Sequence, residues 1–345
     1  MSPGYLGSGS KVTEKQYVLL RTTEKPQSTR EDFLDLRPVL GPDTHWTGAD
    51  GLLAKALDYQ NYLELVDLSI RVKDLARSDA KWPGAFRCVK ETQEQTITID
   101  GRSTMQESIN VDRPPKRPLL SRFTHDLARR KNRRVTEEGV GGLEASGEAE
   151  ESSGSSDEVP EYRCNAGALK DSNDETTVQC AFVLLLKEFT SMVPGRNVEW
   201  TLDHINLRAG FNKTSFYTAR TDGALRVLDT QEPLVIVETK ARMREKQMES
   251  MIMQETAEIA SWILAQPSCS LELEGRRLLF AQDRHQVWIT VAQYDESYRR
   301  YLLNGTVGPN SNIYMQTYGP WNVLIKDHVH ELGLIVVSLI LSSRH

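Results

Sequence analysis

The stretch that decides the fold runs from residue 217 to residue 262 and reads YTARTDGALRVLDTQEPLVIVETKARMREKQMESMIMQETAEIASW. Its pattern predicts a strand, a turn, a second strand and then a long helix. The second strand starts with the apolar run LVIV and ends in Glu238, Thr239 and Lys240. Because side chains alternate between the faces of a strand, Glu238 and Lys240 point the same way and Thr239 points opposite. Asp222 lies at the first strand junction, so pairing of the two strands as a hairpin would bring it near Glu238.

Two carboxylates and an ammonium would then meet at one end of a sheet. Carboxylate oxygens are the ligands that a hard divalent cation prefers, and a positive group beside an attacking water favours hydrolysis. Simpler interpretations stay open for each residue. Asp222 and Gly223 form a dipeptide typical of tight hairpin turns. Glu238 and Lys240 are also consistent with a solvated charge pair at the end of a buried strand.

The same residues resemble the signature of the PD-(D/E)XK nuclease superfamily, which has an acidic residue on one strand and (D/E)-x-K on the next. The helix segment MQETAEIASWIL, at residues 253–264, is similar to that of uncharacterised fungal proteins with a nuclease-like domain of this kind. The block Tyr314–Trp321 and the apolar helix after it are similar too. The resemblance covers about residues 173–343 and departs from the signature at Thr221, where proline is usual.

This resemblance implies an α/β fold with a restriction-endonuclease-like core, in which a mixed central sheet is flanked by helices in the order α-β-β-β-α-β. It implies a metal cofactor, Mg²⁺ or Mn²⁺, held by Asp222, Glu238 and the main-chain carbonyl of Thr239. Lys240 would lower the pKa of the attacking water or stabilise the charged phosphate. The implied activity is hydrolysis of phosphodiester bonds in nucleic acid, with DNA ahead of RNA as the partner.

Two further catalytic candidates, Glu175 and Gln254, also come from the resemblance. Glu175 lies in the first turn of a predicted helix, where an acidic side chain also simply stabilises the helix dipole. Gln254 resembles the helix glutamine of exonuclease-like members, in which a tyrosine follows four residues later. Here Glu258 takes that place. It shares a helix face with Gln254 but has neither the ring nor the hydroxyl donor of tyrosine, so a helix surface position for Gln254 stays open.

Composition limits the class of protein. The 345 residues carry a net charge of −6 and 39% hydrophobic residues, so charge alone gives no argument for a nucleic-acid partner and part of the chain is expected to be disordered. The four cysteines show no metal-ligand spacing and are expected to be reduced thiols. The first residues lack the apolar core of a signal peptide, and no apolar run reaches the ~20 residues of a membrane span. We therefore expect a soluble intracellular protein without a membrane partner.

The N-terminal part is predicted to form two segments. Residues 1–45 are polar and rich in Gly, Pro, Ser and Thr, so little fixed structure is expected there. Residues 46–110 are expected to form an arm of helices and short strands, either an extra layer on the main domain or a small subdomain. In this arm, apolar residues at helical spacing predict one or two helices over 50–76. Alternating residues at 85–89 and 95–100 predict two short strands.

Residues 111–162 are predicted to form a disordered linker whose charges separate into two blocks. Residues 113–134 hold nine Lys or Arg and one acid, whereas residues 137–161 hold nine acids and no Lys or Arg. The basic block suits a nuclear-import signal or an arm that grips phosphates, and a plain solvated linker is the alternative. From this block we expect a nuclear rather than a cytoplasmic location.

Residues 163–345 are expected to form the nuclease-like domain. Its predicted helices are 174–189, 243–264 and a last helix that begins at 323 or 326 and ends at 341. Its predicted strands are 198–207, 215–221, 225–228, 234–240, 277–282, 285–293 and 313–318.

Several basic residues lie close to the signature. They are Arg220, Arg226, Arg242, Arg244 and Lys246. They suit contacts with a phosphate backbone, or simply a solvated helix start. Two classes of function stay open, because a fold does not fix a function. One is a metal-dependent nuclease, and the other is a catalytically inactive module of the same fold that binds nucleic acid or protein partners. An effector nuclease acting in another cell is a third class, against which the lack of a signal peptide argues.

Overall fold

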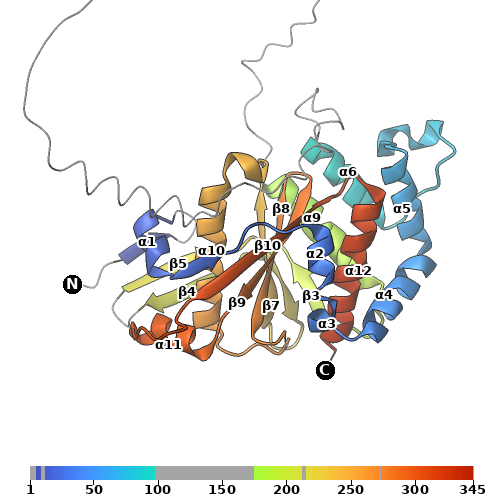
Figure 1. Cartoon of the computed structure of the whole chain (residues 1–345). Helices are drawn as coiled ribbons and strands as arrows, with labels where there is room; N and C mark the ends of the chain where they lie inside the picture. The colour runs from blue at the N-terminus through green and yellow to red at the C-terminus, as the bar shows by residue number, and fades with distance from the viewer. Residues whose placement is uncertain (1–4, 9–11, 98–174, 212–214, 272, 345) are drawn as a thin grey trace, which may run out of the picture. The chain divides into compact units, whose positions relative to one another are not determined.

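A mixed sheet of seven strands lies at the centre of the fold (Figure 1). The strand order is β2-β10-β9-β8-β7-β6-β3, in which β7 runs parallel to β8 and β2 runs parallel to β10. The strands are β2 Thr22–Glu24, β3 Val198–Thr201, β6 Gly223–Val227, β7 Pro233–Lys240, β8 Arg276–Asp283, β9 Gln286–Gln293 and β10 Ile313–Asn322. This computed structural model describes residues 5–8, 12–97, 175–211, 215–271 and 273–344.

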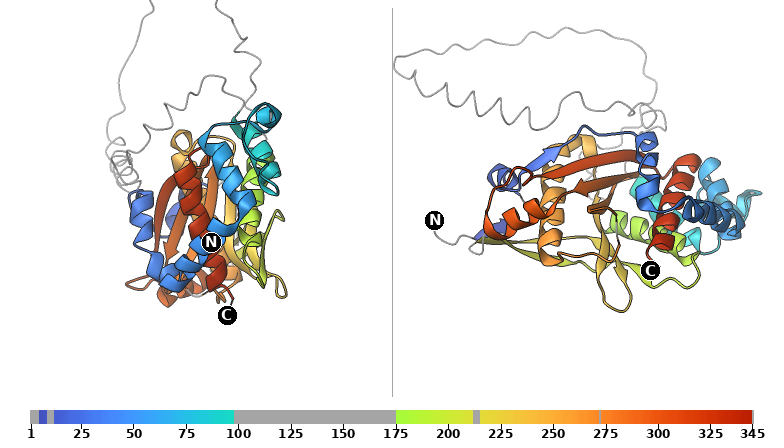
Figure 2. Two further views of the ribbon diagram at one scale, coloured as in Figure 1. Left: turned by 90° about the vertical axis from the view of Figure 1, so that its right-hand side faces the viewer. Right: turned by 60° about the horizontal axis from the view of Figure 1, so that its bottom comes forward.

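Helices cover both faces of the central sheet, as the two views in Figure 2 show. On one side lie α2 Arg30–Leu34, α3 Arg37–Leu40, α4 Asp43–Lys55, α5 Leu57–Asp67, α6 Phe86–Ile97, α9 Glu175–Ser191 and α12 Lys326–Ser342, which share one hydrophobic core with the strands. Of these helices, α2, α9 and α12 lie next to the strands, and the other four pack mainly on α9 and α12. The other face packs against α1 Glu14–Leu19, α10 Met248–Ala265 and α11 Glu296–Asn304. The predicted α/β class, with a mixed central sheet flanked by helices, is therefore confirmed.

The sequence of β7 explains why this strand is central. Val235 and Val237 belong to the hydrophobic core on the α9 side, and Ile236 belongs to the core on the α10 side. A strand that is apolar on both faces requires cover on both faces. Helix α9 supplies that cover on one face and α10 on the other, and α10 also makes the crossover that lets β7 and β8 pair in parallel.

A second, smaller sheet has the order β1-β5-β4 and consists of β1 Tyr5–Ser8, β5 Ser215–Arg220 and β4 Asn206–Phe211. Strands β4 and β5 form an antiparallel hairpin between β3 and β6 in the chain. Leu207 and Ala219 are opposite each other in this hairpin, and both are buried in the core that contains α10 residues. The hairpin therefore lies on the α10 side of the molecule.

Most predicted elements of the C-terminal domain are present. The predicted helix 174–189 is α9, and the predicted strands 234–240, 277–282 and 285–293 are β7, β8 and β9. The predicted strand 198–207 instead divides into β3 and β4. The helix expected from residue 243 begins at Met248, because a 3₁₀ turn, η3 Arg244–Lys246, precedes it. Helix α11 was not predicted.

The N-terminal segment differs from the expectation of little fixed structure over residues 1–45. From Thr13 onward the chain forms α1, β2, α2 and α3, and β2 extends the central sheet beside β10. Capping boxes begin α1 at Thr13 and α2 at Thr29. Local composition is polar, but Phe33 and Leu40 are buried in the main core. Tertiary burial therefore stabilises elements that local propensity alone does not predict.

The predicted arm at 46–110 is not separate from the rest of the fold. All described residues fall in one compact unit, which combines residues 1–118 with 173–345. The strands predicted at 85–89 and 95–100 differ from the structure, in which α6 occupies residues 86–97. Phe86, Val89 and Gln93 are buried at helical spacing, so this segment has a helical period that a short alternating window conceals.

The predicted linker at 111–162 lies outside the described residues. Among the residues that the structure describes, no helix is long and apolar enough to cross a bilayer.

Candidate metal centre

Asp222 lies between β5 and β6 and is held firmly against the end of β7. Its main-chain N–H donates to the carbonyl of Val237 at 2.9 Å. Its carboxylate oxygen Oδ2 accepts two hydrogen bonds from Thr239, from the main-chain N–H at 2.8 Å and from the hydroxyl at 2.7 Å. Asp222 is therefore fixed beside Glu238, as the predicted hairpin requires, although the hairpin partner of β7 is β6 and not β5.

Gly223 has a role in packing, next to Asp222. A Cβ atom at this position would lie 2.5 Å from the carbonyl oxygen of Thr201 on β3. Glycine is needed because β3 and β6 approach closely here, and the left-handed backbone of a tight turn is not involved. The alternative interpretation of Asp222–Gly223 as a simple hairpin dipeptide does not describe this site, since Gly223 already pairs with Val237 in the sheet.

Glu238 and Lys240 point to the same side of β7, as predicted from strand alternation. The ammonium of Lys240 contacts Oε1 of Glu238, Oε1 of Glu175 at 2.8 Å and the carbonyl oxygen of Thr239 at 3.2 Å. These are three of the groups that the sequence singles out. The simple solvated pair that the sequence left open is excluded for Glu238, because its side chain is only 3% exposed.

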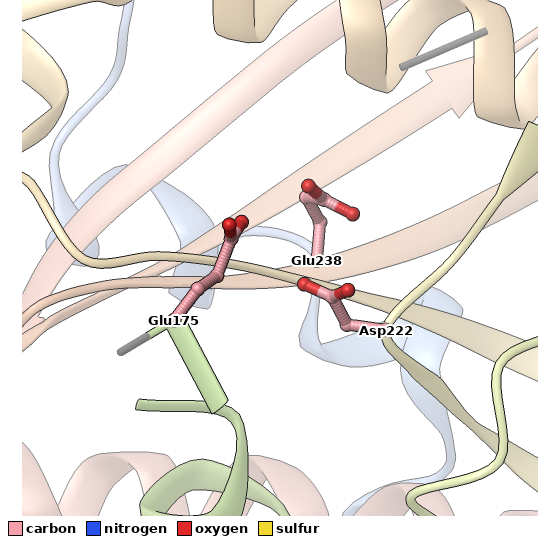
Figure 3. A group of neighbouring side chains, drawn as sticks. All are labelled: Glu175, Asp222 and Glu238. Atoms are coloured by element: carbon pink, nitrogen blue, oxygen red, sulfur yellow. The ribbon is translucent and has the colours of Figure 1, made fainter. Parts of the chain in front are cut away.

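Three carboxylates converge at this position, as Figure 3 shows. Glu175 comes from the first turn of α9, Asp222 from the β5–β6 junction and Glu238 from β7. One oxygen of each lies within 4.8 Å of the others. Their burial is graded, since Glu175 is exposed, Asp222 is half-buried and Glu238 is buried. The cluster therefore opens to solvent at Glu175 and closes at Glu238.

The donor set fits a hard divalent cation. Carboxylate oxygens suit Mg²⁺ and Mn²⁺, and the remaining oxygen of Glu238, Oε2, is buried without a hydrogen-bond partner among the described residues. A buried carboxylate oxygen without a donor is unfavourable, and a cation bound there would satisfy it. The carbonyl of Thr239 is the third predicted ligand. It accepts a hydrogen bond from the Lys240 ammonium, which also contacts Glu175 and Glu238, so this carbonyl lies next to the carboxylate cluster.

Gln254 reaches the cluster from α10. Its side-chain amide donates to Oε1 of Glu238 at 2.6 Å and to Oε1 of Glu258 at 2.8 Å. Gln254 is therefore not a simple helix surface residue, and it bridges two carboxyl groups. The sequence pointed to Gln254 but set Glu258 aside, whereas Glu258 is completely buried next to the site. The spacing of four residues on one helix face was the signal that could have found it.

The electrostatics of the cluster reflect its burial. Burial raises the pKa of Glu238 to about 8, with further increases from Asp222 and Glu175, while Lys240 opposes the change. Burial and then Glu238 raise the pKa of Glu258 well above its usual range. Burial by itself would lower the pKa of Lys240, but the carboxylates of Glu238 and Glu175 outweigh it and raise that pKa. The site thus holds a charged lysine near the carboxyls of Glu238 and Glu258, whose raised pKa values oppose ionisation.

Two side chains that the sequence did not predict support Asp222. The amide of Gln179 on α9 donates to the main-chain carbonyl of Asp222, one helical turn after Glu175. The Nδ1 atom of His204 donates to the carbonyl of Thr221 at 2.9 Å and lies 3.8 Å from Oδ1 of Asp222. The helical spacing from Glu175 indicates a shared face for Gln179, but no local pattern indicates His204.

The basic residues near the signature separate into different environments. Arg244 is completely buried, where it donates to Asp283 at 2.7 Å and to Glu255, so it is not part of a phosphate grip or of a solvated helix start. Arg226 is paired with Glu199 at 2.9 Å and with Asp203 at 3.1 Å.

Two of the predicted basic residues remain on the surface. Arg220 and Arg242 are exposed, and each lies two residues from the signature in the sequence, at Asp222 and Lys240. The side chain of Lys246 lies outside the described residues. Of the four basic residues whose side chains are described, Arg220 and Arg242 are therefore the exposed ones.

Comparison with known proteins gives no match for this chain, neither to a family model nor to a curated protein. The geometry of the cluster is therefore the basis of the functional interpretation.

Proposed function

We propose that this protein is a metal-dependent nuclease that hydrolyses phosphodiester bonds in nucleic acid, with DNA ahead of RNA as substrate. The observation that carries the proposal is the convergence of Glu175, Asp222 and Glu238 beside Lys240. Acids outnumber the cation in this group, so the cluster attracts a divalent metal ion. Its exposed edge at Glu175 leaves the site accessible to a phosphate.

The connectivity of the sheet supports the resemblance to a restriction-endonuclease-like core. The elements α9, β3, β6, β7, α10 and β8 follow one another in the order α-β-β-β-α-β, and the four strands are adjacent in the sheet. The hairpin β4–β5 is inserted between the first and second of these strands. In this assignment the acidic residue precedes the second strand, and the E-x-K triplet ends the third.

Asp222 and Glu238, with the carbonyl of Thr239, would hold Mg²⁺ or Mn²⁺. Glu175 would be the third carboxylate of the cluster around the ion. When bound, the metal supplies a Lewis acid that polarises the phosphoryl oxygen and lowers the pKa of a coordinated water. The Thr239 hydroxyl and N–H orient Asp222, and Gln254 orients Glu238. Lys240 offers its ammonium to the attacking water or to the negative charge that develops on the phosphate.

A direct test replaces the lysine. We expect Lys240→Ala to lose cleavage of single- or double-stranded DNA by about 10²-fold or more, because the positive group beside the water is gone. Binding of Mg²⁺, measured by calorimetry, should persist, since the carboxylates remain. Lys55→Ala, which changes an exposed lysine in the last turn of α4, is the matched control and should cleave normally.

Equal cleavage by the Lys240→Ala and Lys55→Ala proteins, with both folded, would contradict the catalytic role of Lys240. RNA substrates in the same assay, with and without a chelator, separate DNA from RNA cleavage. Asp222→Ala serves as a second inactive variant, which excludes a contaminating nuclease.

A second candidate function is a non-catalytic module of the same fold that binds nucleic acid or protein. It is favoured by the contacts of Lys240, whose ammonium is already shared among Glu175, Glu238 and the Thr239 carbonyl. Such a module would bind nucleic acid in the same assays but would show no Mg²⁺-dependent cleavage in any variant.

The proposed location is nuclear, and it rests on the basic block at residues 113–134. Replacing Lys and Arg by Gln in that block should move a fluorescent fusion of the full chain out of the nucleus. An unchanged distribution would contradict the proposal.

A further inference from the structure

The hairpin β4–β5 is the part of the site region whose charge contrasts most with the rest of the chain. Residues 204–221 contain Arg208, Lys213 and Arg220 and no Asp or Glu, whereas the whole protein has a net charge of −6. A local basic segment on an acidic protein creates a positive field only near that segment. The question is whether the fold displays these charges together and next to the site.

The register of the hairpin places the polar residues on one face. Asn206 is opposite Arg220, and Arg208 is opposite Thr218. Arg208 and Arg220 are therefore diagonal neighbours on the same face, with Cα atoms on the order of 7–8 Å apart. Leu207 and Ala219, which alternate with these residues along the two strands, turn to the opposite face and are buried with residues of α10. The hairpin is thus anchored through one face and presents arginines on the other.

These two arginines are more exposed than Arg226 and Arg244, two other basic residues near the site. Arg208 and Arg220 are both exposed. By contrast, Arg226 is half-buried, and Arg244 is completely buried. Arg220 also precedes the site residue Asp222 by two positions, so the polar face of the hairpin leads directly to the acidic cluster.

We propose that the exposed face of the hairpin, formed by Asn206, Arg208, Thr218 and Arg220, binds the phosphodiester backbone of a nucleic-acid strand and guides it to Asp222. Two guanidinium groups side by side bind phosphates well, because each presents several donors in a fixed plane. Contacts of this type are independent of base sequence. The inference deepens the proposed nuclease function and rests on it for the claim that the bound strand reaches Asp222. Binding of the strand to the hairpin does not itself require catalysis.

The experiment measures binding in the presence of a chelator, so that cleavage plays no part. Fluorescence anisotropy of a labelled DNA duplex and of a labelled single strand is recorded with the full chain over a range of salt concentrations. The test variant is Arg208→Gln with Arg220→Gln. The matched control is Arg71→Gln with Arg77→Gln, two exposed arginines that flank or lie in η2 Val72–Arg77. This control removes the same charge between α5 and α6, at the other end of the fold from β4 and β5 in Figure 1.

We expect the hairpin variant to bind on the order of 10-fold more weakly, with a salt dependence shallower by about 1.4–1.8 in log–log slope, as two lost phosphate contacts imply. The control should match the wild type. Unfolding curves of all proteins exclude a folding defect. Equal binding by the hairpin variant and the control would overturn the proposal, as would a wild type that fails to bind nucleic acid or binds polyglutamate equally tightly.

Cleavage assays on the same proteins separate this inference from the proposed function. Normal DNA binding by the hairpin variant, with loss of cleavage only in Lys240→Ala, would reject the hairpin surface and keep the nuclease. Weakened binding by the hairpin variant, with no cleavage by any protein, would keep the surface and reject the nuclease.

Discussion

At the scale of single residues, the site combines groups with opposite requirements. Lys240 needs the carboxylates of Glu175 and Glu238 to balance its charge, and a divalent cation needs the same oxygens. Glu238 is buried, so its charged form is unfavourable unless a cation is near. The lysine and the metal ion therefore bind the same carboxyl oxygens, and each of the two cations favours the charged form of these carboxylates.

This competition predicts a pH dependence of metal binding. Burial raises the pKa of Glu238 to about 8, so the metal-free protein keeps this carboxyl protonated below that pH. A metal ligand must be deprotonated, and binding therefore releases the proton. We expect the affinity for Mg²⁺ to rise by roughly 10-fold per pH unit up to about pH 8 and to level off above it.

Calorimetry between pH 6 and pH 9, in buffers of different ionisation enthalpy, measures both the affinity and the proton release. Glu238→Gln removes the titrating group and should give weak binding without this slope. A wild-type affinity that is constant over the range would contradict the assignment of Glu238 as a ligand.

Gln254 gives a second prediction at this scale, because its amide separates the buried carboxyls of Glu238 and Glu258. In Gln254→Ala both carboxyls lose a donor, so we expect the free energy of unfolding to fall by about 1–3 kcal/mol and Mg²⁺ affinity to fall with it. The control is Glu258→Gln. Its effect should be small at neutral pH, because the raised pKa of Glu258 already favours the uncharged form. Wild-type stability and metal affinity in Gln254→Ala would show that the bridge is unimportant.

At the scale of elements, the site depends on how closely β3, β6 and β7 approach one another. Asp222 reaches Thr239 only because β6 pairs with β7 from Gly223 onward. On the other side, Gly223 lies against the main chain of Thr201 on β3. The backbone of three strands therefore determines the position of the acidic residue.

Gly223→Ala tests this arrangement. The added Cβ would lie 2.5 Å from the carbonyl oxygen of Thr201, and since both groups belong to the sheet backbone, neither moves easily. We expect a loss of about 1–3 kcal/mol in the free energy of unfolding and weaker metal binding through a displaced Asp222. Denaturant unfolding and calorimetry measure the two effects.

The matched control is Gly51→Ala in α4, where an added Cβ meets nothing within 4 Å. This change should increase stability by roughly 0.5–1 kcal/mol, since alanine favours the helix. Equal stability of the Gly223→Ala and Gly51→Ala proteins would contradict the close approach of β3 and β6.

At the scale of the whole molecule, segments far apart in the chain complete one core. Strand β2 pairs with β10, and Arg30 forms an ion pair with Glu331 on α12 at 2.6 Å. The hydroxyl of Ser342 donates to the carbonyl of Leu40. The described residues before α9 therefore belong to the fold that positions the site, although they contribute no carboxylate to the cluster.

The sequence predicts the elements with a strong period and misses those that depend on distant partners. Strand β7 and the pairing of charged residues at its end could be predicted from the sequence, because strand alternation alone places Glu238 and Lys240 on the same face. Strand β2 was not readable, since three residues acquire a strand structure only beside β10. Arg244 looked like a surface residue after a signature lysine, and only the fold brings Asp283 and Glu255 to it. Long-range pairing has no local signature.

The central claim is that Glu175, Asp222 and Glu238 hold one divalent cation beside Lys240. Crystals of the protein soaked in MnCl₂, with diffraction recorded at the manganese absorption edge, test it most directly. We expect one anomalous peak among these three carboxylates and its loss in crystals of Asp222→Asn. The absence of a peak at this position, or a peak there that persists unchanged in Asp222→Asn, would contradict the claim.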